Sequence, residues 1–147
     1  QLMANSAKKA GIDIEVIREP NDGYWSNVWN NDAKGWCACY WGGRPAETMM
    51  FSAAYVAESK WNDTMWKTTD SAVKFNQLVK DARKELDESK KRDILYECQR
   101  LIYDDGGLLC PLFNSYVSAN SKKIAHGKIA ANWDSDGAKC VERWWFA

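Results

Sequence analysis

The chain has 147 residues, which is enough for a domain with a real core. Lysine plus arginine and aspartate plus glutamate each total 20, so the net charge is zero. This balance argues against nucleic acid as a partner, because phosphate binding needs a basic excess or patch. No apolar run approaches the roughly 18 residues of a membrane span, and no basic and apolar leader opens the chain. The first residues read as a helix with no capping residue before it, so we expect the chain to be part of a longer protein.

The first 30 residues predict a helix, a strand and a short aromatic helix. Residues 2–10 predict a helix that ends at Gly11, and residues 12–16 alternate apolar and acidic side chains as a half-buried strand does. A turn of Pro, Asn, Asp and Gly follows. After it, four large side chains fall at helical spacing, and we expect them in a core rather than a binding site: Tyr24, Trp25, Val28 and Trp29.

Residues 35–41 predict an aromatic strand that ends at a Gly-Gly turn, after which Pro45 takes the first position of a helix. The stretch places two indoles, a phenol and the guanidinium of Arg44 beside the turn. A guanidinium can grip a carboxylate with two hydrogen bonds, and the two glycines allow close approach to the backbone. The pattern favours a ligand-binding edge. In the alternative interpretation, Arg44 only pairs with Glu47, one helical turn away.

A polar, aromatic loop around Trp61 precedes two strong helices, predicted over residues 70–86 and 87–105. Asp87 is expected to cap the second helix, and Gly106 with Gly107 to end it. The apolar stripe of the first helix comprises Phe75, Leu78, Val79, Ala82 and Leu86, and that of the second comprises Ile94, Leu95, Cys98, Leu101 and Ile102. The short link between them predicts an antiparallel hairpin in which each helix buries one stripe.

The last 40 residues predict two strand-like runs, followed by an ending at residues 132–147 that is loop-like until residues 140–146. Residues 108–118 form a mostly apolar, strand-like run that Pro111 interrupts, so an edge or bulge is expected there. Residues 123–125 are expected to pair nearby, and His126, the one histidine, is expected in an exposed turn. Strands that alternate with helices favour an α/β layer arrangement.

The sequence carries no pattern typical of an enzyme or a metal site. It lacks the nucleophile-elbow, phosphate-loop, zinc-protease and dinucleotide motifs and has no evident acid–base pair. Cys37 and Cys39 have no second cysteine pair or histidine cluster to complete a zinc site. On a strand their side chains would lie about 7 Å apart, too far for a relaxed disulfide. We therefore predict no catalysis, no cofactor and no metal.

Several short motifs occur in a characteristic order along nearly the whole chain. They are Gly-Ile-Asp-Ile-Glu-Val at 11–16, Gly-Trp at 35–36, Trp-Asn-Asp-Thr at 61–64, Leu-Asp-Glu-Ser-Lys-Lys-Arg at 86–92, Asp-Asp-Gly-Gly at 104–107 and Cys-Pro-Leu-Phe at 110–113. In this order they resemble the extracytoplasmic solute-binding proteins of ABC transporters, in the dipeptide, oligopeptide and nickel class (family 5 type). Residues 41–45 and 142–147 are similar to a subgroup of peptide-type binding proteins.

The resemblance implies a two-lobed receptor in the periplasm that closes on a small, peptide-like solute and delivers it to a membrane permease. It implies an α/β chain that forms the C-terminal part of the second lobe of a periplasmic-binding-protein-like fold (class II, dipeptide-binding-like), with a mixed sheet flanked by helices. The lobe would run to about residue 120, and residues 121–147 would form a C-terminal return segment. The first lobe and the leader would belong to the rest of the same polypeptide.

The predicted ligand-binding residues are Trp36, Cys39, Tyr40, Trp41, Arg44, Asn62 and Asp63. Peptide binders of this family often carry an Asp three residues after the strand Trp, where it pairs with the α-ammonium of the ligand. Counted from Trp36, that position is Cys39, and a thiol does not supply the charge of a carboxylate. An opine, a modified peptide or an oligosaccharide therefore stays open beside a peptide.

Two functions of other classes stay open. One is a stand-alone carbohydrate-binding module that uses Trp36, Trp41 and Trp61 as a platform. The other is a hydrolase fragment, whose activity would depend on an acidic residue rather than on Trp36 or Arg44.

Overall fold

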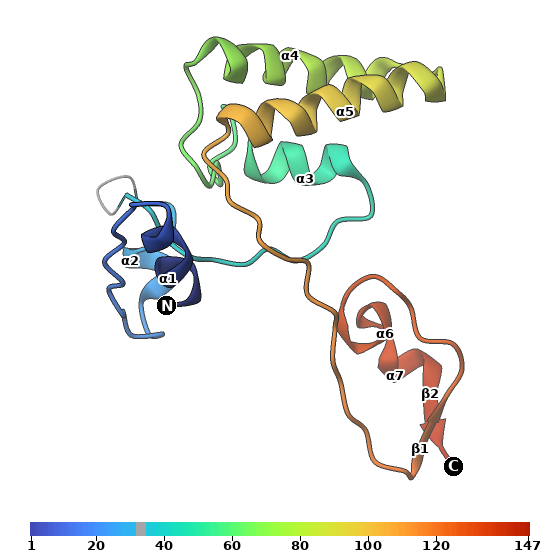
Figure 1. The fold of residues 1–147 in the computed structure, drawn as a ribbon. Coiled ribbons are helices and arrows are strands. Elements are labelled where there is room, and N and C mark those ends of the chain that lie inside the picture. The colour runs from blue at the N-terminus through green and yellow to red at the C-terminus, as the bar shows by residue number, and fades with distance from the viewer. Residues whose placement is uncertain (32–34) are drawn as a thin grey trace. The chain divides into compact units, whose positions relative to one another are not determined.

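A computed structural model describes residues 1–31 and 35–147 (Figure 1). The chain divides into two compact units, residues 1–37 and 38–147. Among the described residues, no helix combines the length and the apolar character that a membrane crossing requires.

The described residues of the first unit form two helices, α1 (Leu2–Lys9) and α2 (Tyr24–Asn27). The chain leaves α1 through Gly11, whose φ of 77° suits glycine. The strand predicted over residues 12–16 is wrong, because this segment has no regular structure. The core predicted around α2 is also wrong: no residue of α2 is buried, and Trp25 meets Tyr24 and Trp29 edge to face at ring distances of 5.7 Å. A unit this small buries only a modest share of its apolar surface, so Trp25 stays exposed and Trp29 is half-buried.

The second unit has its core among three helices, α3 (Glu47–Ala54), α4 (Asp70–Lys84) and α5 (Glu88–Asp105) (Figure 1). The predicted hairpin is confirmed, since α4 and α5 pack along each other and α3 packs on α4. The largest core side chains are Phe51, Tyr55, Trp66, Phe75, Val79, Cys98, Leu101 and Ile102. Leu86 does not join its predicted stripe, because α4 ends at Lys84, and its side chain is 91% exposed.

Side-chain caps fix the ends of α4 and α5. Asp87 accepts hydrogen bonds from the backbone N–H groups of Ser89 and Lys90, as predicted for an N-cap. At the other end of the hairpin, Thr69 caps α4 and donates to Asp105 Oδ2 over 2.7 Å. Trp66 Nε1 donates to the same carboxylate oxygen over 2.9 Å. These hydrogen bonds hold the pKa of Asp105 below its ordinary value, and the one from Thr69 has the largest effect.

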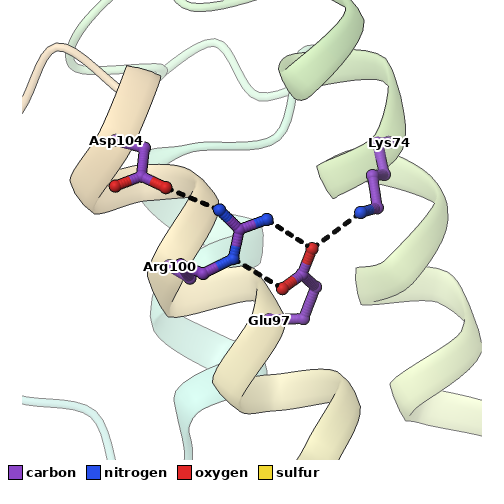
Figure 2. Close-up of polar contacts among 4 residues, drawn as sticks. All are labelled: Lys74, Glu97, Arg100 and Asp104. Carbon is purple, nitrogen blue, oxygen red and sulfur yellow. Dashed lines mark hydrogen bonds and ion pairs between the residues drawn. The ribbon is translucent and has the colours of Figure 1, made fainter.

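A network of four charged side chains joins the outer faces of α4 and α5 (Figure 2). Arg100 donates from Nε and Nη2 to the two oxygens of Glu97, each over 2.8 Å, and from Nη1 to Asp104 over 2.6 Å. Lys74, on α4, donates to Glu97 over 2.6 Å. The hydrogen bonds from Arg100, followed by that from Lys74, lower the pKa of Glu97 from 4.5 to about 2.

This network predicts a pH dependence of stability. Since the pKa of Glu97 is lower in the folded chain, its contribution is complete above pH 4.5 and is lost as the pH falls toward 2. We expect Glu97→Gln to be slightly less stable than the parent at pH 7, because exposed ion pairs contribute little, and we expect the difference to shrink as the pH falls toward 2. Urea unfolding at pH 7, 4 and 2.5 measures the difference, with the exposed Glu88→Gln as control. A constant difference at all three pH values would contradict the prediction.

The remainder of the second unit is mostly irregular. The strands predicted over residues 35–41 and 108–118 are both wrong, and Pro45 precedes α3 by two residues because the backbone of Ala46 is extended. The one sheet of the described residues pairs β1 (Ile124–His126) with β2 (Trp144–Phe146) in antiparallel register. The mixed sheet flanked by helices, which the family resemblance implies for the whole lobe, stays a prediction.

The C-terminal sheet overturns the expected position of His126. This residue lies in β1 opposite Trp144, half-buried, with its ring 5.1 Å from the indole, rather than in an exposed turn. Two short helical segments connect to β2, namely α6 (Asp134–Ala138) and α7 (Cys140–Arg143).

Candidate functional site

The Gly-Gly turn brings Arg44 back over its own backbone. Arg44 is half-buried, and its Nη1 donates to the carbonyl oxygens of Gly42 over 2.6 Å and of Gly43 over 3.4 Å. Its guanidinium carbon lies 5.9 Å from the ring centre of Trp41 and 5.5 Å from that of Trp133, within the range of cation–π attraction. Among the described residues, Arg44 makes no ion pair, so the expected alternative of a pair with Glu47 is not seen.

Trp41 connects this guanidinium to a carboxylate. The Trp41 Nε1–H donates to Asp63 Oδ2 over 3.0 Å, and the Cys39 thiol donates to the same oxygen over 3.3 Å. Cys39 and Trp41 therefore both contact Asp63, so three predicted ligand-binding residues from two distant parts of the chain lie together. We define the Trp41 cluster as Cys39, Trp41, Arg44 and Asp63 together with Trp133.

Asp63 is held in place by the end of α3 and the loop after it. Its backbone N–H donates to the carbonyl of Ala54 over 2.9 Å. The adjacent Asn62 is 1% exposed, and its side-chain amide lies within hydrogen-bond distance of the carbonyls of Tyr55, Val56 and Trp66. Burial raises the pKa of Tyr55, and the negative charge of Asp63 adds to the shift. In this structure Asn62 shapes the loop that carries the carboxylate.

The two remaining predicted residues are surface aromatics. Trp36, in the first unit, is 64% exposed, and Tyr40, in the second, is 76% exposed. Exposed aromatic rings of this size supply stacking area to a ligand. Trp61, expected in the platform of a carbohydrate module, has the Lys60 ammonium 4.7 Å from its ring centre, so a cation already occupies that ring face.

Sequence reasoning missed two residues at the Gly-Gly turn. The phenol oxygen of Tyr116 accepts a hydrogen bond from the Gly43 N–H over 3.4 Å, and Trp133 lies against Arg44. A Cβ atom built on Gly42 would lie 4.0 Å from Trp133 Cζ3, so this indole also packs near the backbone of the turn. Neither residue stands in a pattern with residues 41–44, because the contacts join parts of the chain that are far apart in sequence.

A separate groove of about 600 Å³ lies between the beginnings of α3 and α5. Its lining includes the acidic side chains of Glu47 and Glu88 and the basic side chains of Lys91 and Arg92. In the part of the chain that the structure describes, no three His, Cys, Asp or Glu side chains gather in a way that could hold a metal ion.

Comparison of the chain with protein-family models, with curated proteins and with solved structures gives no match.

Proposed function

We propose that the chain is the ligand-binding portion of a solute-binding protein, the substrate-binding component of an ABC importer. It would capture a peptide-like small solute in the periplasm and deliver that solute to a membrane permease. The observation that carries the proposal is the Trp41 cluster, in which one indole has a carboxylate 3.0 Å from its nitrogen and a guanidinium carbon 5.9 Å from its ring centre. Opposite charges beside an apolar ring suit a zwitterionic solute such as a peptide or an opine.

The Cys39–Asp63 contact bears on the choice of solute. The sequence places a cysteine where related peptide binders often have an aspartate, but the Asp63 carboxylate lies 3.3 Å from the Cys39 sulfur. A negative charge is therefore present beside this position, although it comes from another part of the chain. This contact supports an ammonium-bearing solute and favours a peptide or an opine over an oligosaccharide.

The exposed apolar run at residues 108–118 supports a larger receptor. Leu109, Leu112, Phe113 and Val117 of this run are all exposed. Contiguous exposed apolar side chains are typical of a surface that another part of a protein covers. We infer that the chain forms the C-terminal part of the second lobe and that the first lobe belongs to the same polypeptide.

The test is a titration of intrinsic tryptophan fluorescence with di- to pentapeptides, opines and short oligosaccharides. It uses the complete receptor polypeptide beside the 147-residue chain. We expect a saturable change with a zwitterionic solute in the complete receptor and little change in the chain alone. A response of the isolated chain to oligosaccharides would favour the alternative, a stand-alone carbohydrate-binding module, and the importer proposal would be withdrawn.

Replacing Arg44 should weaken binding in the complete receptor. We expect Arg44→Ala to lower the affinity for the solute at least tenfold, about 1.4 kcal/mol, because the guanidinium is the cation of the cluster. Trp36→Ala should have an effect of similar size through lost stacking. Arg92→Ala, which removes an exposed guanidinium from α5, is the matched control and should leave affinity unchanged. Unchanged affinity in both Arg44→Ala and Trp36→Ala would move the site elsewhere.

A further inference from the structure

Trp133 lies in the C-terminal part of the chain and contacts Arg44 of the site. The backbone of Trp133 has an unfavourable conformation. Its φ is 62° and its ψ is 153°, a combination that is essentially confined to glycine. The strain continues beyond it, since Ser135, Asp136 and Ala138 also have positive φ, as does Gly137. Such conformations persist only where the surroundings fix them, and they are concentrated at functional sites.

Asp136 is the residue that fixes this turn. Its side chain is 4% exposed, and its Oδ1 accepts from the backbone N–H of Ala130 over 2.6 Å. Its Oδ2 accepts from Trp144 Nε1 over 3.0 Å, and Arg143 Nη1 lies 3.0 Å from Oδ1. Donors on both sides of the turn therefore converge on one buried carboxylate, which keeps the segment from Ala130 to Trp144 closed around it.

The indole that this turn presents restrains Arg44. Nη1 of Arg44 is already engaged by the carbonyls of Gly42 and Gly43, and Trp41 and Trp133 both lie within 6 Å of its guanidinium carbon. Among the described residues, no hydrogen bond engages the edge formed by Nε and Nη2. That edge has the spacing of the two oxygens of a carboxylate. A guanidinium restrained in this way loses less entropy when it binds such a group.

We propose that Trp133 is a specificity-determining residue of the site, which holds the Nε–Nη2 edge of Arg44 ready for a carboxylate of the solute, and that Asp136 is the positioning residue for Trp133. The proposal rests on the proposed function and adds the chemical class of the group that Arg44 selects. A solute that lacks a carboxylate then binds less tightly, because it leaves the restrained guanidinium without its acceptor.

Trp133→Gly separates binding from folding. Glycine adopts the backbone angles of residue 133 without strain, so we expect the variant to fold at least as stably as the parent. The indole is lost, and selectivity for a carboxylate should fall. A purely structural role for Trp133 would move stability and binding in the same direction. Trp145→Ala, which removes an exposed indole from β2, is the matched control.

The experiment is equilibrium dialysis of the complete receptor against a mixture of unmodified tripeptides and against the same mixture with C-terminal amides, with bound peptides measured by mass spectrometry. We expect the parent to retain the carboxylates at least tenfold better than the amides. Trp133→Gly and Asp136→Asn should each reduce this ratio severalfold, and Trp145→Ala should keep it. Circular dichroism verifies that each variant is folded. If Asp136→Asn does not fold, the result for Trp133→Gly alone decides the test.

The outcomes distinguish the inference from the function on which it rests. Equal retention of acids and amides by the parent, or an unchanged ratio in Trp133→Gly, overturns the role of Trp133 while peptide binding stands. If the parent retains neither mixture, the inference is overturned, and so is the proposal that the solute is a peptide.

Discussion

Phe75→Ala is expected to destabilise the second unit by about 3–5 kcal/mol, the usual cost of removing a buried phenyl ring from a core. Phe75 is 0% exposed, and its ring lies 5.5 Å from that of Phe51 and 5.2 Å from that of Trp66. The side chain thus joins α3, α4 and the loop before α4. Its loss leaves a cavity among rings that cannot collapse without moving a helix. Because whole domains are stable by only about 5–15 kcal/mol, much of the unit's stability depends on this residue.

Urea unfolding followed by circular dichroism at 222 nm measures the effect. Val73→Ala is the matched control, because Val73 lies two residues away on the same helix and is 60% exposed. The control should change stability by less than about 0.5 kcal/mol, as surface substitutions generally do. A Phe75→Ala variant as stable as Val73→Ala would show that α3 and the hairpin do not share one core.

The helices α4 and α5 could be predicted because their signals are local. The stripe through Phe75, Val79 and Ala82 repeats with the helical period, and Thr69 and Asp87 cap the backbone a few residues away. The strands could not be predicted in this way. A strand needs a partner for its backbone groups, and residues 12–16, 35–41 and 108–118 have the composition of strands but form none.

The candidate site was predictable in part for the same reason. Arg44 and Trp41 are neighbours in sequence, so their contact follows from one short motif. The contact of Asp63 with Cys39 and Trp41 requires the loop after α3 to return to the Gly-Gly turn, which residue spacing does not encode. Trp133 depends on a run of positive φ angles at residues of which most are not glycine, and such a conformation has no sequence signal.

Asn62 gives the second large expected effect, and it bears on the site. Its side-chain carbonyl accepts from the Trp66 N–H over 3.2 Å, and its amide reaches the carbonyls of Tyr55 and Trp66 over 3.4 and 2.9 Å. Asn62→Ala leaves several buried backbone groups without partners, at about 1–3 kcal/mol for each unsatisfied group. We therefore expect a loss of about 3 kcal/mol in the free energy of unfolding, measured by urea denaturation.

The same variant should weaken ligand binding indirectly, because Asp63 is the next residue and depends on this loop for its position. Asn114→Ala, at an exposed asparagine in the irregular run, is the control and should change neither stability nor affinity. If Asn62→Ala kept the stability of the parent but lost affinity, Asn62 would contact the solute directly. A loss of stability with a smaller loss of affinity is the expected result, since the buried amide then acts on the solute only through the carboxylate that it positions.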